Sequence, residues 1–223
     1  SANYQNRVDV ASNLAREWVD QEGVDMIIES TDSAAAIAIQ NIGKEKNILT
    51  VAAGSASTAL TNEGCTPTGI HYVYDTFALA TGTGNAIVKS GLTDWFFITA
   101  DYAFGHSLEE NTASVVKELG GNIVGTVRHP FKATDYSSFI LQAQSSGSDV
   151  VAFANAGTDF STALKQASEF GVVQGGQTTA GMLVFLTDIY ALGLDVAQGL
   201  TYTTGFYWDY NDETRAFAER FKE

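Results

Sequence analysis

Cysteine is nearly absent from this chain of 223 residues, which excludes two kinds of covalent or metal-bound framework. The single cysteine, Cys65, cannot form an internal disulfide, and it has no second cysteine or nearby histidine with which to build a metal site. We therefore interpret Cys65 as an ordinary loop or packing residue. Cysteine usage leaves the cellular compartment undecided.

Basic side chains are also scarce, with 12 Lys and Arg against 26 Asp and Glu and a formal net charge of −14. A surface of this sign repels phosphate backbones and anionic lipid headgroups, so we expect no nucleic acid and no membrane-surface partner. No apolar run reaches the roughly 18 residues that a membrane-spanning helix needs. The first ten residues lack the charged and apolar regions of a signal peptide, as a mature secreted protein also would.

Motifs for cofactors and catalysis are missing as well. No phosphate-binding GxxxxGK[ST] loop occurs. Gly82 and Gly84 look like the start of a dinucleotide fingerprint, but they lie inside a helical pattern, and Ile87 stands at the third glycine position. The three histidines lie far apart in the sequence, without zinc-helix spacing, and no GxSxG elbow is present. We expect no cofactor, no metal, no catalytic residue and no enzymatic activity.

Residues 95–157 carry a clear alternation of strand and helix signals. Apolar runs at 95–99, 122–127 and 150–154 lack the period-two pattern of half-buried strands, and helical segments separate them. This arrangement predicts an α/β fold with a doubly wound, Rossmann-like parallel sheet, which binds ligands beyond the carboxyl ends of its strands. The loops expected there are residues 30–34, 52–57, 100–105 and 155–159.

The remaining chain continues the same alternation. Ser33 is a candidate cap for the second helix, and Asn211 or Asp212 opens the last one. We predict helices at 6–22, 34–42, 77–89, 160–170 and 212–221, strands at 24–28, 48–51, 70–74, 177–182 and 200–204, and a short helix or turn at 185–192.

Small polar residues gather near the predicted helix N-termini. Ser33, Ser55 and Ser57 could combine hydroxyls with free backbone N–H groups, a combination that binds carboxylates. The alternative is that these serines only cap their helices.

Aromatic residues crowd the same predicted crevice. Tyr74, Tyr102 and Phe104 follow strands, and Phe206, Tyr207, Trp208 and Tyr210 form a dense group near the end. They could build a flat apolar slot for an aromatic or large aliphatic ligand. Ordinary packing at a domain junction is the alternative interpretation.

Four ordered segments resemble a known family. They read VDMIIESTDSAAAIA, ILTVAAGSASTALT, WFFITADYAFGHSLEE and DVVAFANAGTDFSTALKQASEFG. In this order they resemble the type I periplasmic solute-binding proteins of branched-chain amino acid ABC importers, across essentially the whole chain. The resemblance implies two doubly wound lobes that close on a small carboxylate ligand, an ABC transporter permease as partner, and a periplasmic location.

The resemblance also implies roles for individual residues. Ser33 would contact the ligand carboxylate, the loop of Gly54, Ser55 and Ala56 would offer N–H groups and a hydroxyl, and Phe104 would cover the ligand from the second lobe. With the aromatic candidates, the predicted ligand-binding residues are Ser33, Ala34, Gly54, Ser55, Ala56, Tyr74, Tyr102, Phe104, Asn155, Asp159, Met182 and Phe206.

Two positions depart from the family pattern. Met182 stands where amino-acid binders place a glutamate against the ligand ammonium, and Tyr74 replaces a common basic residue. A buried ammonium needs a compensating carboxylate, so a standard amino acid is disfavoured. Together with the aromatic group at 206–210, this favours aromatic acids such as benzoates or cinnamates.

The family pattern makes the chain look like an internal fragment, since it begins and ends in predicted helices and the relatives are over a hundred residues longer. We expect an incomplete first lobe, made of residues 1–76 and 206–223, and a nearly complete second lobe at 77–205. Exposed sheet edges in the first lobe would favour self-association.

Two other functions share this type of fold. One is a ligand-sensing domain of a receptor or transcription regulator, which a DNA-binding or transmembrane segment in the flanks would support. The other is a doubly wound enzyme, which would need a nucleophile and base in the crevice.

Overall fold

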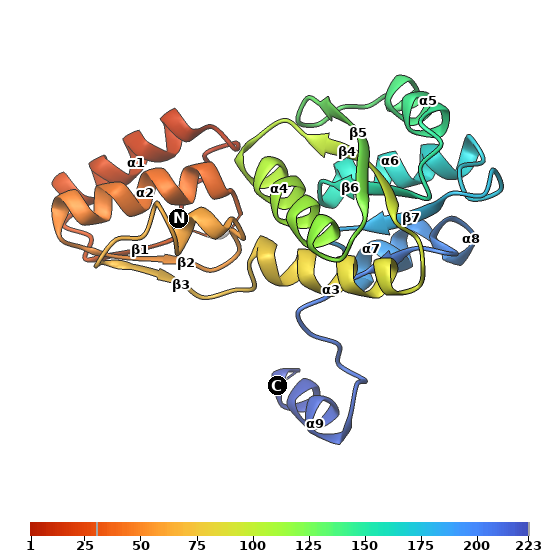
Figure 1. Ribbon diagram of the computed structural model, residues 1–223. Coiled ribbons are helices and arrows are strands. Elements are labelled where there is room, and N and C mark those ends of the chain that lie inside the picture. Colours follow the sequence, from red (N-terminus) through yellow and green to blue (C-terminus); the bar gives the residue numbers. More distant parts are fainter. Residues whose placement is uncertain (30, 223) are drawn as a thin grey trace.

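The computed structural model describes residues 1–29 and 31–222 and contains two parallel β-sheets (Figure 1). The strands are β1 (Met26–Glu29), β2 (Leu49–Ala52), β3 (Gly69–His71), β4 (Asp94–Ala100), β5 (Asn122–His129), β6 (Val150–Ala154), β7 (Thr178–Gly181) and β8 (Thr201–Tyr202). The helices are α1 (Val8–Asp20), α2 (Ser33–Lys46), η1 (Thr58–Leu60), α3 (Thr76–Lys89), α4 (Ala103–Glu118), α5 (Ser137–Ser145), α6 (Gly157–Glu169), α7 (Leu186–Leu192), α8 (Leu194–Ala197) and α9 (Asp212–Phe221).

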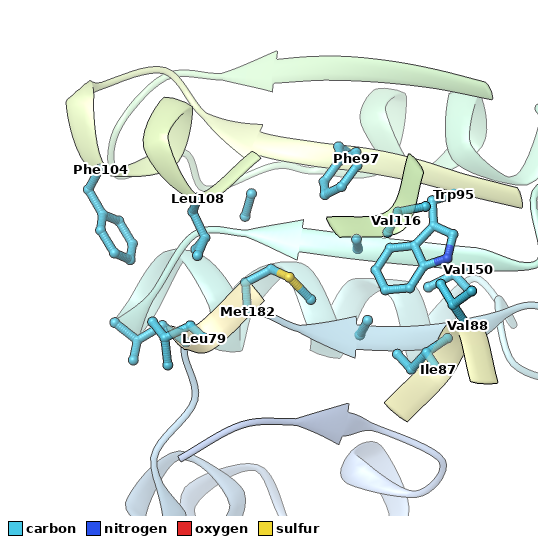
Figure 2. Close-up of a cluster of buried hydrophobic side chains, with 14 of the residues drawn as sticks. Leu79, Ile87, Val88, Trp95, Phe97, Phe104, Leu108, Val116, Val150 and Met182 are labelled. Atoms are coloured by element: carbon cyan, nitrogen blue, oxygen red, sulfur yellow. The ribbon is translucent and has the colours of Figure 1, made fainter. Parts of the chain in front are cut away.

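The larger sheet has five strands in the order β5-β4-β6-β7-β8, all parallel. Every residue of β6 is buried, because helices cover both faces of the sheet. Trp95, Phe97 and Val150 pack with α3 and α4 on one face (Figure 2), and Phe153 packs with α5 and α6 on the other. This confirms the doubly wound fold that the apolar runs predict.

The smaller sheet has three parallel strands in the order β1-β2-β3 and is covered on one face only. Ile27 on that face packs with Ala15 and Ile39 of the two helices that lie over it in Figure 1, α1 and α2. On the opposite face Met26, Ile28, Leu49, Ile70 and Tyr72 are exposed. We call these five residues the open face of the three-stranded sheet.

The structure corrects several predicted boundaries. Asp32, not Ser33, caps α2, since its carboxylate accepts a hydrogen bond from the Ala35 N–H at 2.7 Å. Residues 103–105 belong to the first turn of α4 instead of a loop, and the strand predicted at 70–74 ends at His71. The short helices η1 and α8 were not predicted. The predicted loop at 30–34 includes Ser30, which lies outside the described residues.

The last helix stands apart from both sheets (Figure 1). It covers Asp212–Phe221, as predicted, and the side chain of Asn211 caps it by accepting from the Thr214 N–H at 2.9 Å. Phe217 and Phe221 of this helix remain exposed. Within the described part of the chain, no helix combines the length and apolar character needed to cross a bilayer.

Candidate ligand-binding crevice

The loops that follow β1 and β2 meet at a buried carboxylate, Glu29. It is 4% exposed and accepts hydrogen bonds from the Tyr4 hydroxyl at 2.8 Å and from the Thr31 and Asp32 N–H groups, each at 2.7 Å. The Ser55 hydroxyl also donates to Glu29. A serine hydroxyl carries one hydrogen, so Ser55 Oγ presents only lone pairs to a ligand. The donor that Ser55 can offer is its backbone N–H.

Ser33 and Asp32 join these loops at the N-terminus of α2. Ser33 Oγ accepts a hydrogen bond from the Ser57 N–H at 3.2 Å, and Ala34 is half-buried beside it. Burial raises the pKa of the Asp32 carboxyl, and the charge of Glu29 adds to this effect. The crevice side of the three-stranded sheet therefore combines small polar groups with two adjacent carboxyls.

The loop after β2 contacts the five-stranded sheet through helix α4. Ala56 belongs to the same buried cluster as Phe104 and Leu79. Ser107 of α4 lies 2.7 Å from Thr76 Oγ1, hydroxyl to hydroxyl. The residues of this loop and the start of α4 are thus held together, although they are far apart in the sequence.

A tight turn carries the chain from β4 into α4. A Cβ on Gly105 would lie 2.1 Å from the Ala100 carbonyl oxygen, so the turn needs glycine there. The turn places Tyr102 beside Phe104, with ring centroids 6.0 Å apart. Burial raises the pKa of the Tyr102 hydroxyl, with smaller contributions from the charges of Asp159 and Asp32.

The end of β6 adds a second buried polar group. Asn155 is fully buried, and its Nδ2 lies 3.1 Å from His129 Nε2. Its Oδ1 has no hydrogen-bond partner among the described residues. Asp159, in the first turn of α6, is buried and accepts from the Lys132 N–H at 3.2 Å. Both side chains lie beyond the carboxyl ends of β4 to β6, where the topology predicts a ligand.

Three predicted site residues lie apart from these polar groups. Met182 is buried in the cluster under α3 and α4 (Figure 2), and the Thr112 hydroxyl donates to its Sδ at 3.3 Å. Tyr74 stacks at a tilt on Phe185, with centroids 6.5 Å apart. Phe206 is 51% exposed, and its ring centroid lies 5.6 Å from that of Phe217 in the last helix, α9.

Sequence reasoning missed Glu29, Asp32, His129 and Tyr136. A usable signal existed for two of them, since Glu29 and His129 are the last residues of β1 and β5 and polar strand ends face the crevice in parallel sheets. Asp32 and Tyr136 become recognisable only through their contacts with these residues.

Comparison with known proteins places the chain in a family. The sequence pattern described as periplasmic binding protein matches residues 1–223. The chain belongs to the periplasmic binding protein family. A Leu/Ile/Val-binding protein homolog 6 from Brucella abortus is 25% identical over 214 residues, which is 94% of this chain and 54% of the relative. The chain thus spans about half the length of this curated relative.

Solved structures of two periplasmic proteins superpose on nearly the whole chain. One is a periplasmic binding protein from Burkholderia mallei, with a TM-score of 0.93 and 48% identity, covering 99% of this chain and 58% of that protein. The other is a branched-chain amino acid ABC transporter periplasmic ligand-binding protein from Burkholderia xenovorans, with a TM-score of 0.81, 38% identity, and coverage of 99% and 59%. Both agree with the resemblance that the four sequence segments carry.

Proposed function

We propose that this chain is the ligand-capturing part of a solute-binding protein that serves an ABC importer in the periplasm. Its function would be capture between two lobes, hinge closure and docking to the permease, with no chemical conversion. The observation that carries the proposal is the contact between the loop after β2 and the start of α4, where Ala56 packs with Phe104 and the Thr58 hydroxyl lies 3.3 Å from that of Ser107, in a member of the periplasmic binding protein family.

We propose a small carboxylate as the ligand, with an aromatic acid favoured over a branched-chain amino acid. Backbone N–H groups at Gly54, Ser55 and Ala56 make no hydrogen bond to another described residue, and they would bind the carboxylate. Ser33 would add a polar contact, while Tyr102 and Phe104 would line the ring. Met182, which belongs to the same buried cluster as Ala56 and Phe104, supplies no charge for an ammonium group.

Proteins with the same fold bind ligands of both kinds. A solute-binding protein from R. palustris, 20% identical with a TM-score of 0.88 and covering 97% of this chain and 59% of that one, holds 4-hydroxybenzoate. A leucine-binding protein from Thermotoga maritima, also 20% identical with a TM-score of 0.83 and coverage of 99% and 63%, shares the fold. At this identity the fold alone is shared, so our choice depends on the residues of the crevice.

Isothermal titration calorimetry with benzoate, cinnamate, leucine and valine tests the ligand class. We expect binding of at least one aromatic acid and a dissociation constant for leucine at least tenfold weaker. Tight binding of leucine, with no heat from either aromatic acid, would overturn the ligand proposal. Binding of none of the four would contradict the proposed function itself.

We propose further that residues 1–76 and 206–223 belong to one lobe and residues 77–205 to the other. Two unpartnered apolar surfaces support this assignment. The first is the open face of the three-stranded sheet, and the second is the aromatic side of α9 with Phe217 and Phe221. Parallel sheets are normally covered on both faces, so α9 would dock on the open face.

A disulfide trap tests this lobe assignment. In a Cys65→Ser background, we expect Ile28→Cys and Phe217→Cys to form an intramolecular disulfide on mild oxidation. The control pair joins Phe217→Cys to Val124→Cys, an exposed residue of the other sheet, and should remain reduced. A disulfide between two copies would instead indicate self-association through the open face, and no disulfide would contradict the docking of α9.

A further inference from the structure

A buried network of four polar side chains lies beyond the ends of β5 and β6. It contains His129, Tyr136, Asn155 and Asp159, of which His129, Tyr136 and Asn155 are completely buried and Asp159 nearly so. The rings of His129 and Tyr136 meet edge to face with centroids 4.8 Å apart. Burial raises the pKa of the Tyr136 hydroxyl, and the nearby Asp159 carboxylate contributes through its charge and a hydrogen bond.

The hydrogen bonds of His129 define which nitrogen carries its proton. Nδ1 lies 3.0 Å from the carbonyl oxygen of Pro130, and a carbonyl oxygen can only accept. Nδ1 is therefore the donor, and in the neutral ring Nε2 is an acceptor. The Tyr136 hydroxyl, 3.4 Å from Nδ1, lies on the same side of the ring.

This tautomer in turn fixes the orientation of Asn155. The lone pair of His129 Nε2 faces Asn155 at 3.1 Å, so the amide must present its NH₂ group to the ring. The reverse orientation would set the carbonyl oxygen against a lone pair. Asn155 Oδ1 is thus turned away from the ring and is left without a partner among the described residues. A buried acceptor without a donor is rare and points to a group that binds there.

Asp159 adds a carboxylate in the first turn of α6, four residues after Asn155. Its carboxylate accepts the Lys132 N–H at 3.2 Å, while the Lys132 ammonium lies over the Phe131 ring. This end of the crevice therefore offers acceptors and negative charge. A ligand group that donates a hydrogen bond would be stabilised there, and a second carboxylate would be repelled.

We propose that His129 and Tyr136 are positioning residues that hold Asn155 Oδ1 free for the ligand, so that the crevice selects an acid with a hydroxyl or amino group at its far end. This inference rests on the proposed function, because it assigns the ligand carboxylate to the loop of Gly54, Ser55 and Ala56. It names two residues that would act on specificity through Asn155 without touching the ligand.

Calorimetry with matched benzoates tests the preference for a donor. The probes are 3- and 4-hydroxybenzoate, 3- and 4-aminobenzoate, and 3- and 4-fluorobenzoate, because fluorine is close to a hydroxyl in size but donates no hydrogen bond. We expect at least one donor-bearing acid to bind about tenfold or more tightly than its fluoro counterpart. Equal affinities of all pairs, with measurable binding, would overturn the inference and leave the proposed function intact.

Substitutions at His129 separate positioning from simple structural support. His129→Phe removes the acceptor that orients Asn155, so the donor-to-fluoro affinity ratio should fall to about one while fluorobenzoate binding is unchanged. His129→Gln can still accept from Asn155 and should retain the ratio. Tyr136→Phe should lower the ratio, and the matched control Tyr190→Phe, at an exposed tyrosine, should not. An equal loss for every ligand in His129→Phe would contradict the positioning role.

A ligand-free measurement keeps the inference testable if no benzoate binds or a variant fails to fold. Nitrogen-15 chemical shifts of the His129 ring distinguish the two neutral tautomers in the unmodified protein. We expect a protonated Nδ1 and an unprotonated Nε2. A proton on Nε2 would overturn the inference whatever the ligand proves to be.

Discussion

The two sheets of this protein are built from the same parallel strand–helix units but differ in how they are covered. In the five-stranded sheet, β6 is buried at every residue and hydrophobic clusters lie on both faces. In the three-stranded sheet, β1 alternates between exposed and buried residues, and Ile28 is 60% exposed. Three of the four residues of β1 are apolar, yet two of these, Met26 and Ile28, are exposed, so burial depends on what packs against each face.

Replacing one isoleucine in each sheet tests this difference most directly. Ile98→Ala, at a fully buried residue of β4, should reduce the free energy of unfolding by about 3–4 kcal/mol through lost burial and a cavity. Ile28→Ala, on the open face, should cost less than about 1 kcal/mol while α9 stands apart from the sheet, because most of that side chain is then in water. A larger loss is expected where α9 docks on this face. Chemical denaturation measures both. Similar losses would show that the open face is covered in solution.

The turn into α4 should be the next most sensitive point of the five-stranded sheet. Gly105→Ala would press a Cβ against the Ala100 carbonyl, so we expect a loss of about 2–3 kcal/mol as the turn is forced apart. Gly84→Ala is the control inside another helix, since its Cβ would lie 2.9 Å from Cγ1 of Val115, a side-chain atom that can move more easily than a backbone carbonyl. Denaturation midpoints that fall equally for both variants would contradict this account.

The corresponding turn of the three-stranded sheet depends on Glu29. Glu29→Gln replaces two acceptor oxygens with one, so a buried donor such as the Ser55 hydroxyl or Tyr4 hydroxyl loses its partner. We expect a loss of about 1–2 kcal/mol, measured by chemical denaturation. Glu45→Gln at the exposed surface is the control and should leave stability nearly unchanged. An equal response of both variants would show that the Glu29 network adds no stability.

Asp32→Asn should change the free energy of unfolding least, and its main effect should be on how that free energy depends on pH. Burial raises the pKa of Asp32 in the folded protein, so the native carboxyl keeps its proton to higher pH than the unfolded one. Its contribution to stability is present below the unfolded value of about 4 and is lost as pH rises through the raised pKa. Asparagine also caps helices, so the variant should lack this decline while α2 stays intact. Parallel stability–pH curves for the two proteins would show that the shift is absent.

Much of the fold could be predicted because strands and helices leave local signals. Strand β6 covers the apolar run predicted at 150–154. Helix α9 covers the predicted helix at 212–221, and Asn211 caps it. The cap of α2 was placed one residue too late, since Asp32 and Ser33 are both good capping residues. In the structure Asp32 has the extended backbone of the cap position, and the Ser33 hydroxyl accepts from the Ser57 N–H, 24 positions away.

The candidate site was less predictable than the fold. The sequence predicts which loops follow the strands, but it does not show the direction of the hydrogen bonds within them. The resemblance implies that Ser55 offers a hydroxyl to the ligand, and the structure shows that this hydroxyl donates its hydrogen to Glu29. Met182 remains a predicted ligand-binding residue, and it lies beside Thr112 in the hydrophobic cluster that also contains Ala56 and Phe104.

The sequence by itself determined the parallel doubly wound fold and the strand ends at which a ligand would bind, because hydrophobic periodicity and helix signals act over a few residues. The tertiary structure decided which polar atoms at those ends remain available. Ser55, Asn155 and Asp159 each hydrogen bond to a partner more than 25 positions away in the chain, and hydrogen-bond saturation depends on distance in space. The local sequence pattern predicts that these residues lie at strand ends, and their long-range hydrogen bonds determine which of their atoms can bind a ligand.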